Sequence, residues 1–368
     1  MPIDWSARTT EIFLNPRIPS ENRQASSAHL QDYPLDRHIW VATSGTTSRF
    51  KFVALGKEAF LSSAEAMNAY LGSDASDVWL HALPDFHVGG IAIWARSYLS
   101  GAQVVKAPLR WNPEAYVDSV HQNRATLSSL VPTQVYDLVS HRLPPPPTLR
   151  AVIVGGGALA EPVFHQAQEL GWHLFPSYGL TECASTVAVA NNSGVAEILP
   201  HVQVNINAQG YICLKGSSLL TLYGIQRGKT IHFIDPKENG WLTTEDKGEL
   251  VDQQLRIGGR ADDFVKILGE SVNLISLQNT LDECKCQLEI ARDAALIAVP
   301  YPREGSRMHL VIEGRSCSEI SALIEAYNLR VMPYESIQRV HSVEKIPRSP
   351  LGKLQKADLF VRNLNGLL

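Results

Sequence analysis

Apolar positions between residues 127 and 176 alternate between helical and strand-like spacing. The spacing predicts helices over residues 133–139 and 161–170, while continuous apolar runs predict buried strands over 149–154 and 172–175. A strand, helix, strand order is typical of a parallel sheet, because parallel strands need a crossover connection. The pattern therefore predicts an α/β core in this part of the chain.

The pattern changes over residues 203–255, where short β-like runs are separated by turn residues such as Glu238-Asn239-Gly240. These runs predict a small barrel or a twisted antiparallel sheet. Together with the α/β core they predict a large domain over residues 1–260, with parallel or mixed sheets flanked by helices and a smaller β-barrel-like part.

Helix and strand patterns mix again after residue 260. The predicted helices cover residues 276–288 and 318–327, and the predicted strands cover 294–299 and 309–312. Such a mixture predicts a compact α+β domain over residues 261–368, smaller than the first.

Charge and cysteine content limit the classes of ligand and compartment. The 33 basic and 37 acidic residues give a net charge of -4, which excludes an electrostatic footprint for nucleic acid. Five scattered cysteines make no disulfide framework, and Cys284-Lys285-Cys286 alone favours buried or helical thiols over a metal pair. Neither a signal segment nor an uninterrupted membrane-length apolar run is present, so we expect a soluble, cytoplasmic protein with a small ligand.

Three separated segments contain the groups that phosphate chemistry requires. Tyr178-Gly179-Leu180-Thr181-Glu182 places a hydroxyl and a carboxylate in one tight loop, and a hydroxyl-rich run precedes it at residues 43–51. A lysine follows far downstream within Pro350-Leu351-Gly352-Lys353. Donors for phosphate oxygens, a magnesium anchor and a mobile cation are thereby available. The pentapeptide and the triple glycine Gly155-Gly156-Gly157 follow predicted strands, where ligands bind in open α/β sheets, so we expect one shared site.

Six motifs in fixed order resemble the adenylate-forming superfamily of acyl-CoA synthetases, adenylation domains and luciferases. The resemblance runs from about Ile39 to Lys356 and implies an adenylate-forming fold. The motifs cover residues 43–51, 83–90, 155–158, 178–182, 240–248 and 257–266, and the lysine segment 350–353 follows them.

The resemblance implies a binding role for each motif. It assigns the β- and γ-phosphates of ATP to a loop that contains Thr43, Ser44, Gly45, Thr46, Thr47 and Lys51. It assigns adenine to Gly155, Gly156, Gly157 and Tyr178. Thr181 then contacts the α-phosphate, Glu182 holds Mg²⁺, and Asp246 accepts both ribose hydroxyl groups, with Arg260 as a further ribose or phosphate contact.

The resemblance also implies two reactions at one site. Lys353 is expected to bridge the acid and the α-phosphate while an acyl-adenylate forms and pyrophosphate leaves. A thiol, that of coenzyme A, must then reach the same carbonyl carbon, so Lys353 has to move away. Asp262 would be the hinge of this motion, and Gly269 would approach the pantetheine tunnel.

Local sequence around the second and fourth motifs resembles the o-succinylbenzoate-CoA ligases of menaquinone synthesis. That acid has an aromatic ring and two carboxylates, so its pocket needs an apolar wall and a polar or cationic group. The candidates are His87, Thr133, Gln134, Ser185 and Thr186. Three alternatives stay open: a CoA ligase for another aromatic or medium-chain acid, an adenylating enzyme that serves a carrier protein, and a nucleotide-binding protein without catalysis.

Two features depart from the family pattern. Ser48 and Phe52 stand where family loops have glycine, so the phosphate loop should be stiffer. Only 42 residues precede Thr43, which implies that an N-terminal subdomain is mostly missing. We expect residues 1–36 or a partner subunit, with a homodimer as one option, to cover the exposed sheet flank.

Overall fold

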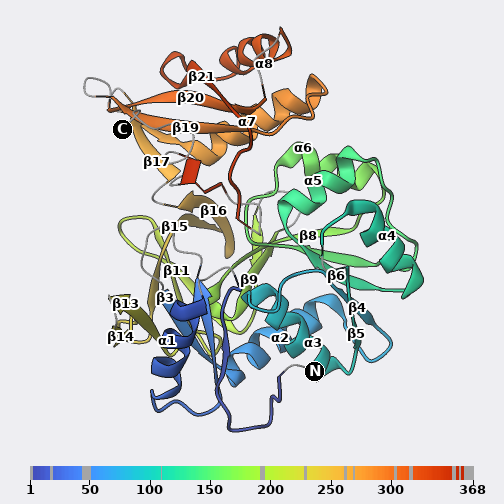
Figure 1. Ribbon diagram of the computed structural model, residues 1–368, viewed down its shortest axis with the longest axis vertical. Helices are drawn as coiled ribbons and strands as arrows, with labels where there is room; N and C mark the ends of the chain where they lie inside the picture. The colour runs from blue at the N-terminus through green and yellow to red at the C-terminus, as the bar shows by residue number, and fades with distance from the viewer. Residues whose placement is uncertain are drawn as a thin grey trace. The chain divides into compact units, whose positions relative to one another are not determined.

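The computed structural model of the protein describes most of the chain. The described residues are 3–16, 20–43, 51–108, 110–190, 195–227, 230–260, 263–267, 270–301, 305–314, 318–349, 354–355 and 358–359. They form two compact units (Figure 1). The first comprises Met1–Gly156 and Leu170–Ile257, and the second comprises Gly157–Glu169 and Gly258–Leu368. The predicted hinge Asp262 lies outside the described residues, so the hinge stays a prediction.

An eleven-stranded sheet forms the centre of the first unit, and its parallel half confirms the predicted α/β core. The parallel strands, in sheet order, are β5 (Gln103–Lys106), β4 (Val78–His81), β6 (Leu127–Leu130), β7 (Ala151–Val154) and β8 (Leu174–Leu180). The helices between them include α3 (Val88–Ser100), α4 (Pro113–Gln122) and α5 (Pro132–Ser140). Asn112 caps α4 through the backbone N–H of Ala115, and Pro113 occupies its first turn.

The pairing direction changes at β8. This strand runs parallel to β7 and antiparallel to β9 (Ser185–Ala190). The antiparallel half of the sheet continues through β10 (Ala196–Ile198), β16 (Gln254–Arg260), β15 (Leu242–Val251), β12 (Tyr211–Gly216) and β11 (Val202–Ile206). The strands predicted over residues 203–255 are therefore antiparallel as expected, and they are shared between this sheet and a second one.

The second sheet of this unit has five strands. They are β1 (Glu11–Phe13), β2 (His38–Thr43), β3 (Lys51–Gly56), β13 (Leu222–Arg227) and β14 (Thr230–Ile234), and helix α1 (Ser20–Gln31) contacts β14. Antiparallel pairing of β2 with β3 sets Thr43 opposite Lys51. The two ends of the predicted phosphate loop are thus adjacent.

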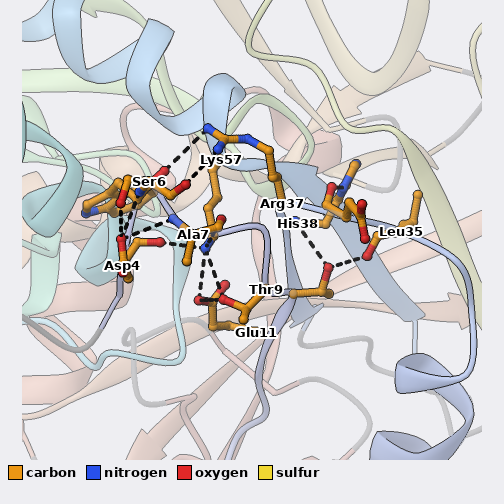
Figure 2. A network of polar contacts seen from close by, with 12 residues as sticks. Asp4, Ser6, Ala7, Thr9, Glu11, Leu35, Arg37, His38 and Lys57 are labelled. Carbon is orange, nitrogen blue, oxygen red and sulfur yellow. Dashed lines mark hydrogen bonds and ion pairs between the residues drawn. The ribbon is translucent and has the colours of Figure 1, made fainter.

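The N-terminal segment packs into the core of the first unit, and its strand β1 pairs with β2. Ile3 and Trp5 are buried in the same hydrophobic cluster as Phe60 of helix α2 (Lys57–Leu71). Lys57 is fully buried, and its Nζ donates to the carbonyl oxygens of Asp4 at 2.6 Å and Ala7 at 3.1 Å (Figure 2). The same Nζ lies 3.0 Å from Oε1 of Glu11. One buried ammonium therefore ties the N-terminal segment to α2.

The second unit contains the predicted α+β elements. Strands β19 (Ala294–Tyr301), β20 (Gly305–Glu313) and β21 (Ile337–Val343) form one sheet, and β17 (Phe264–Ile267) pairs with β18 (Glu270–Asn273). Helices α7 (Leu274–Gln287) and α8 (Ser318–Asn328) match the predicted ones. Helix α6 (Glu161–Glu169) also belongs to this unit, although the sequence pattern predicts it as part of the α/β core. Asn273 begins α7 by accepting hydrogen bonds from two backbone N–H groups. Within the described parts of both units, every helix is too short or too polar to cross a membrane.

Replacement of Lys57 by methionine tests the tie between the N-terminal segment and α2. We expect Lys57→Met to lower the free energy of unfolding by about 3–5 kcal/mol, because Glu11 and two carbonyl groups lose the buried cation that they share. Chemical denaturation measures the loss. Arg8→Met is the matched control, since Arg8 pairs with Asp36 on the exposed surface of the same segment and should matter little. Equal losses in the two variants would contradict this role for Lys57.

Candidate functional site

The predicted pentapeptide comprises the last three residues of β8 and the first two residues of the turn that leads to β9. A Cβ atom on Gly179 would lie 2.0 Å from the carbonyl oxygen of Ser185, so only glycine fits there. Thr181–Cys183 form one 3₁₀ turn, and Ala184 and Ser185 have positive φ angles of 52° and 131°. This strained turn holds Thr181 and Glu182 at the end of the parallel half of the sheet.

Glu182 meets two donors from the second sheet. Its Oε1 accepts hydrogen bonds from Nζ of Lys51 at 2.9 Å and from the hydroxyl of Tyr223 at 3.0 Å. The Lys51 ammonium also lies 4.4 Å from the centre of the Tyr223 ring. Burial, together with the adjacent Glu182 carboxylate, raises the pKa of Tyr223 above its ordinary value. The predicted phosphate-loop lysine and the predicted magnesium anchor are therefore in direct contact.

The donor set at Glu182 fits magnesium better than a metal held by protein alone. Within the described ranges no three His, Cys, Asp or Glu side chains gather into a metal site. The Glu182 side chain is 12% exposed, and the two donors described above both bind its Oε1. One carboxylate with a second oxygen to offer suits Mg²⁺, which usually keeps waters and takes further ligands from substrate phosphates.

Tyr178 and Asp246 form a second pair of predicted ligand residues. The hydroxyl of Tyr178 donates to Oδ2 of Asp246 at 2.8 Å, and the Asp246 backbone N–H donates to the hydroxyl of Thr244 at 3.1 Å. Burial, followed by the charge of Asp246, raises the pKa of Tyr178. The residues predicted for adenine and for ribose thus lie side by side, 68 positions apart in sequence.

The glycines after β7 lie at the expected edge of the sheet. Gly155 follows the last residue of β7, and a Cβ atom on it would lie 3.1 Å from the hydroxyl oxygen of Ser177 on β8. Gly156 adopts a φ of 83°, which favours glycine. Gly157 belongs to the second unit. The close approach of Ser177 and the positive φ angle thus favour glycine at these two positions, and a contact with adenine stays a prediction.

Arg96 is a functional candidate that sequence reasoning missed. Its side chain is 2% exposed on α3, and its Nη2 donates to the hydroxyl oxygens of Thr186 at 3.2 Å and Ser185 at 3.5 Å. Its Nε has no partner, and no carboxylate lies within ion-pair distance, among the residues whose placement is described. Burial lowers the pKa of Arg96 to about 10. A single arginine after the apolar run 91–95 was the signal that could have identified it.

The remaining acyl-pocket candidates have mixed outcomes. Ser185 and Thr186 contact Arg96, as described above. His87 is the N-cap residue of α3, with its ring 4.6 Å from that of Phe86. Gln134 accepts a hydrogen bond from the backbone N–H of Val131, so it caps α5, where Thr133 occupies the first turn. Contact of these side chains with a substrate stays a prediction.

Six of the predicted ligand residues lie outside the described residues: Ser44, Gly45, Thr46, Thr47, Gly269 and Lys353. The backbone of Thr43 ends strand β2, and the backbone of Arg260 ends strand β16. Their roles stay predictions. Cys284 is buried on α7, and Gln166 donates to the sulfur of Cys286 at 2.8 Å, in agreement with the predicted helical thiols.

Comparison with known proteins relates the chain to a family and to named ligases. A family model described as AMP-binding enzyme matches residues 20–250. A 2-succinylbenzoate–CoA ligase of Escherichia coli strain K12 is 33% identical over 236 residues, which are 62% of this chain and 49% of the relative. A ligase of the same name from Bacillus pumilus is 28% identical over 94% of this chain and 73% of the relative. The chain spans about half the length of the first of these relatives.

Solved structures with the same fold support the architecture. An o-succinylbenzoate CoA synthetase from Bacillus subtilis, in complex with its acyl-adenylate intermediate, has a TM-score of 0.76 at 24% identity, covering 87% of this chain and 68% of the other. A variant of Escherichia coli MenE with bound OSB-AMS has a TM-score of 0.73 at 22% identity, covering 92% of this chain and 85% of the other. The predicted adenylate-forming fold is thereby confirmed.

The burial of Arg96 without a counter-ion predicts a residue that does not stabilise the protein. We expect Arg96→Met to leave the free energy of unfolding unchanged or raised, because the variant no longer buries an uncompensated charge. Thermal and chemical denaturation measure it. Lys57→Met provides the contrast, since that buried cation has its partners in place. A loss in Arg96→Met as large as in Lys57→Met would contradict the assignment.

Proposed function

Because the chain belongs to the AMP-binding enzyme family, we propose that it is an AMP-forming acid–thiol ligase that joins o-succinylbenzoate to coenzyme A. In the first step a carboxylate oxygen of the acid attacks the α-phosphorus of ATP, and the bond to pyrophosphate breaks. In the second step the thiol sulfur of coenzyme A attacks the acyl carbon, its proton is released, and AMP leaves. The named ligases among the relatives support this reaction, which belongs to menaquinone synthesis.

One observation carries the choice of acid: the buried guanidinium of Arg96. A charge in a low-dielectric interior is costly unless an opposite charge accompanies it. Its hydroxyl partners Ser185 and Thr186 supply hydrogen bonds but no charge. A substrate with two carboxylates offers one for adenylation and one as the missing counter-ion. Arginine also recognises a carboxylate with two parallel hydrogen bonds.

The described residues offer part of the electrostatic stabilisation that the first step requires. Both reactants are negatively charged, and losing one donor that stabilises the developing charge costs on the order of 10²–10³ in rate. Lys51 is the described cation next to Glu182, and its partly exposed side chain can reach a phosphate group. When bound at Glu182, Mg²⁺ supplies Lewis-acid neutralisation of the phosphate oxygens. Tyr178 and Asp246 provide an aromatic face and a carboxylate for the nucleoside.

The alternatives differ in what they leave unexplained. A ligase for a monocarboxylic acid would leave Arg96 without a counter-ion. A nucleotide-binding protein without catalysis would have no acid substrate, so it would also leave Arg96 without a counter-ion. Delivery to a carrier protein in place of coenzyme A, a homodimer and a cytoplasmic location stay predictions.

Product analysis tests the proposal. We expect the protein, with ATP, Mg²⁺, coenzyme A and o-succinylbenzoate, to yield the acyl-CoA, AMP and pyrophosphate in equal amounts by mass spectrometry and phosphorus NMR. Benzoate is the matched control acid, because it keeps the ring and one carboxylate. In Arg96→Met we expect kcat/KM for o-succinylbenzoate to fall roughly 10²-fold or more, since the second carboxylate loses its cation.

Three results would count against the proposal. Equal turnover of benzoate and o-succinylbenzoate would contradict the claim that o-succinylbenzoate is the substrate. Formation of ADP instead of AMP would contradict an acyl-adenylate intermediate. Binding of ATP with no product from any acid would favour the nucleotide-binding alternative.

A further inference from the structure

We infer that Tyr223 is a positioning residue for Glu182, holding one carboxylate oxygen so that the other is presented to the metal that accompanies ATP. Tyr223 occurs in none of the motifs that resemble the family, and nothing in the sequence pattern distinguishes it. The inference rests on the proposed function, because it assigns Glu182 to the metal of a nucleotide.

The register of the second sheet places Tyr223 and Lys51 on one face. Strand β13 pairs antiparallel with β3, with Ile225 opposite Lys51 and Tyr223 opposite Val53. Residues two apart on a strand project to the same side, so Tyr223 is a diagonal neighbour of Lys51. Both side chains reach the carboxylate of Glu182, which arrives from the turn after β8. The contact therefore joins the two sheets of the first unit.

The two donors share Oε1, but they differ in what they can do when a cation arrives. Lys51 carries a positive charge and is 35% exposed, so a divalent ion at Glu182 would repel it, and its flexible side chain can swing to a phosphate. Tyr223 offers a phenol hydroxyl, which is an uncharged donor, and this hydroxyl binds Oε1 at 3.0 Å. An uncharged donor could stay on Oε1 when Glu182 holds a cation, because it would not be repelled. Tyr223 is thus the permanent partner and Lys51 the exchangeable one.

These separate roles of Tyr223 and Lys51 explain why both side chains bind Glu182. Lys51 neutralises Glu182 and spares the protein an unpaired, nearly buried carboxylate. Lys51 would leave Glu182 for a phosphate group when a nucleotide and its metal bind. Tyr223 fixes the carboxylate plane throughout, as partners of metal-ligating carboxylates do in other sites.

Calorimetric titration of ATP, with and without Mg²⁺, tests the inference without any turnover. We expect Tyr223→Phe to bind metal-free ATP as the unmodified protein does, while the gain in affinity on adding Mg²⁺ falls about 10-fold or more. Mn²⁺ binding to the complex with a non-hydrolysable ATP analogue, followed by electron paramagnetic resonance, should weaken by a similar factor. Tyr98→Phe is the control, because Tyr98 is 43% exposed on α3 and its ring packs against Trp5.

Lys51→Met is expected to change the other of the two quantities, the affinity for ATP itself. Unchanged binding of metal-free ATP by Tyr223→Phe excludes a folding defect in that variant. We expect Lys51→Met to weaken ATP binding with and without metal, while the gain from Mg²⁺ is kept. A Tyr223→Phe protein whose Mg²⁺ gain equals that of Tyr98→Phe overturns the inference, and so does an unmodified protein that shows no Mg²⁺ gain. The proposed ligase reaction fails separately, by absence of acyl-CoA in a protein that binds ATP with Mg²⁺.

Discussion

The ion pair between Lys51 and Glu182 is the contact on which the candidate site depends. It brings together the end of the predicted phosphate loop and the turn after β8, which belong to different sheets of one unit. The geometry follows from two local facts: β2 and β3 close the loop at its base, and Gly179 allows the tight turn that carries Glu182. Without this convergence, hydroxyl groups, a carboxylate and an ammonium would be scattered along the chain with no common ligand.

Lys57 and Arg96 are both buried cations, but their surroundings differ. Lys57 is surrounded by carbonyl oxygens and a carboxylate, so its charge is compensated and it organises the N-terminal segment. Arg96 contacts two hydroxyl groups and lies 5.6 Å from the centre of the Trp79 ring, but no carboxylate among the described residues pairs with it. Burial alone therefore does not distinguish a structural cation from a candidate ligand-binding cation. The distinction comes from whether the protein supplies a negatively charged partner.

Sequence reasoning predicted features that are local and missed those that depend on packing. Two of the parallel strands, β7 and β8, the antiparallel region and the α+β elements followed from the sequence pattern. The motif resemblance assigned Tyr178 and Asp246 to neighbouring parts of one nucleotide, and the two side chains are in contact. Tyr223 could not be found because its role arises from strand register across β3 and β13. Arg96 was hidden in an apolar helix, where the sequence does not reveal whether a carboxylate lies nearby. Gln134 was predicted for substrate, whereas the structure also uses it to cap a helix.

The most direct test of the account is a crystal structure of the protein with ATP and Mg²⁺. The account predicts the metal on the carboxylate of Glu182, the ammonium of Lys51 moved from that carboxylate to a phosphate oxygen, and the ribose beside Asp246. A triphosphate bound elsewhere, with the contact between Lys51 and Glu182 intact, would contradict it.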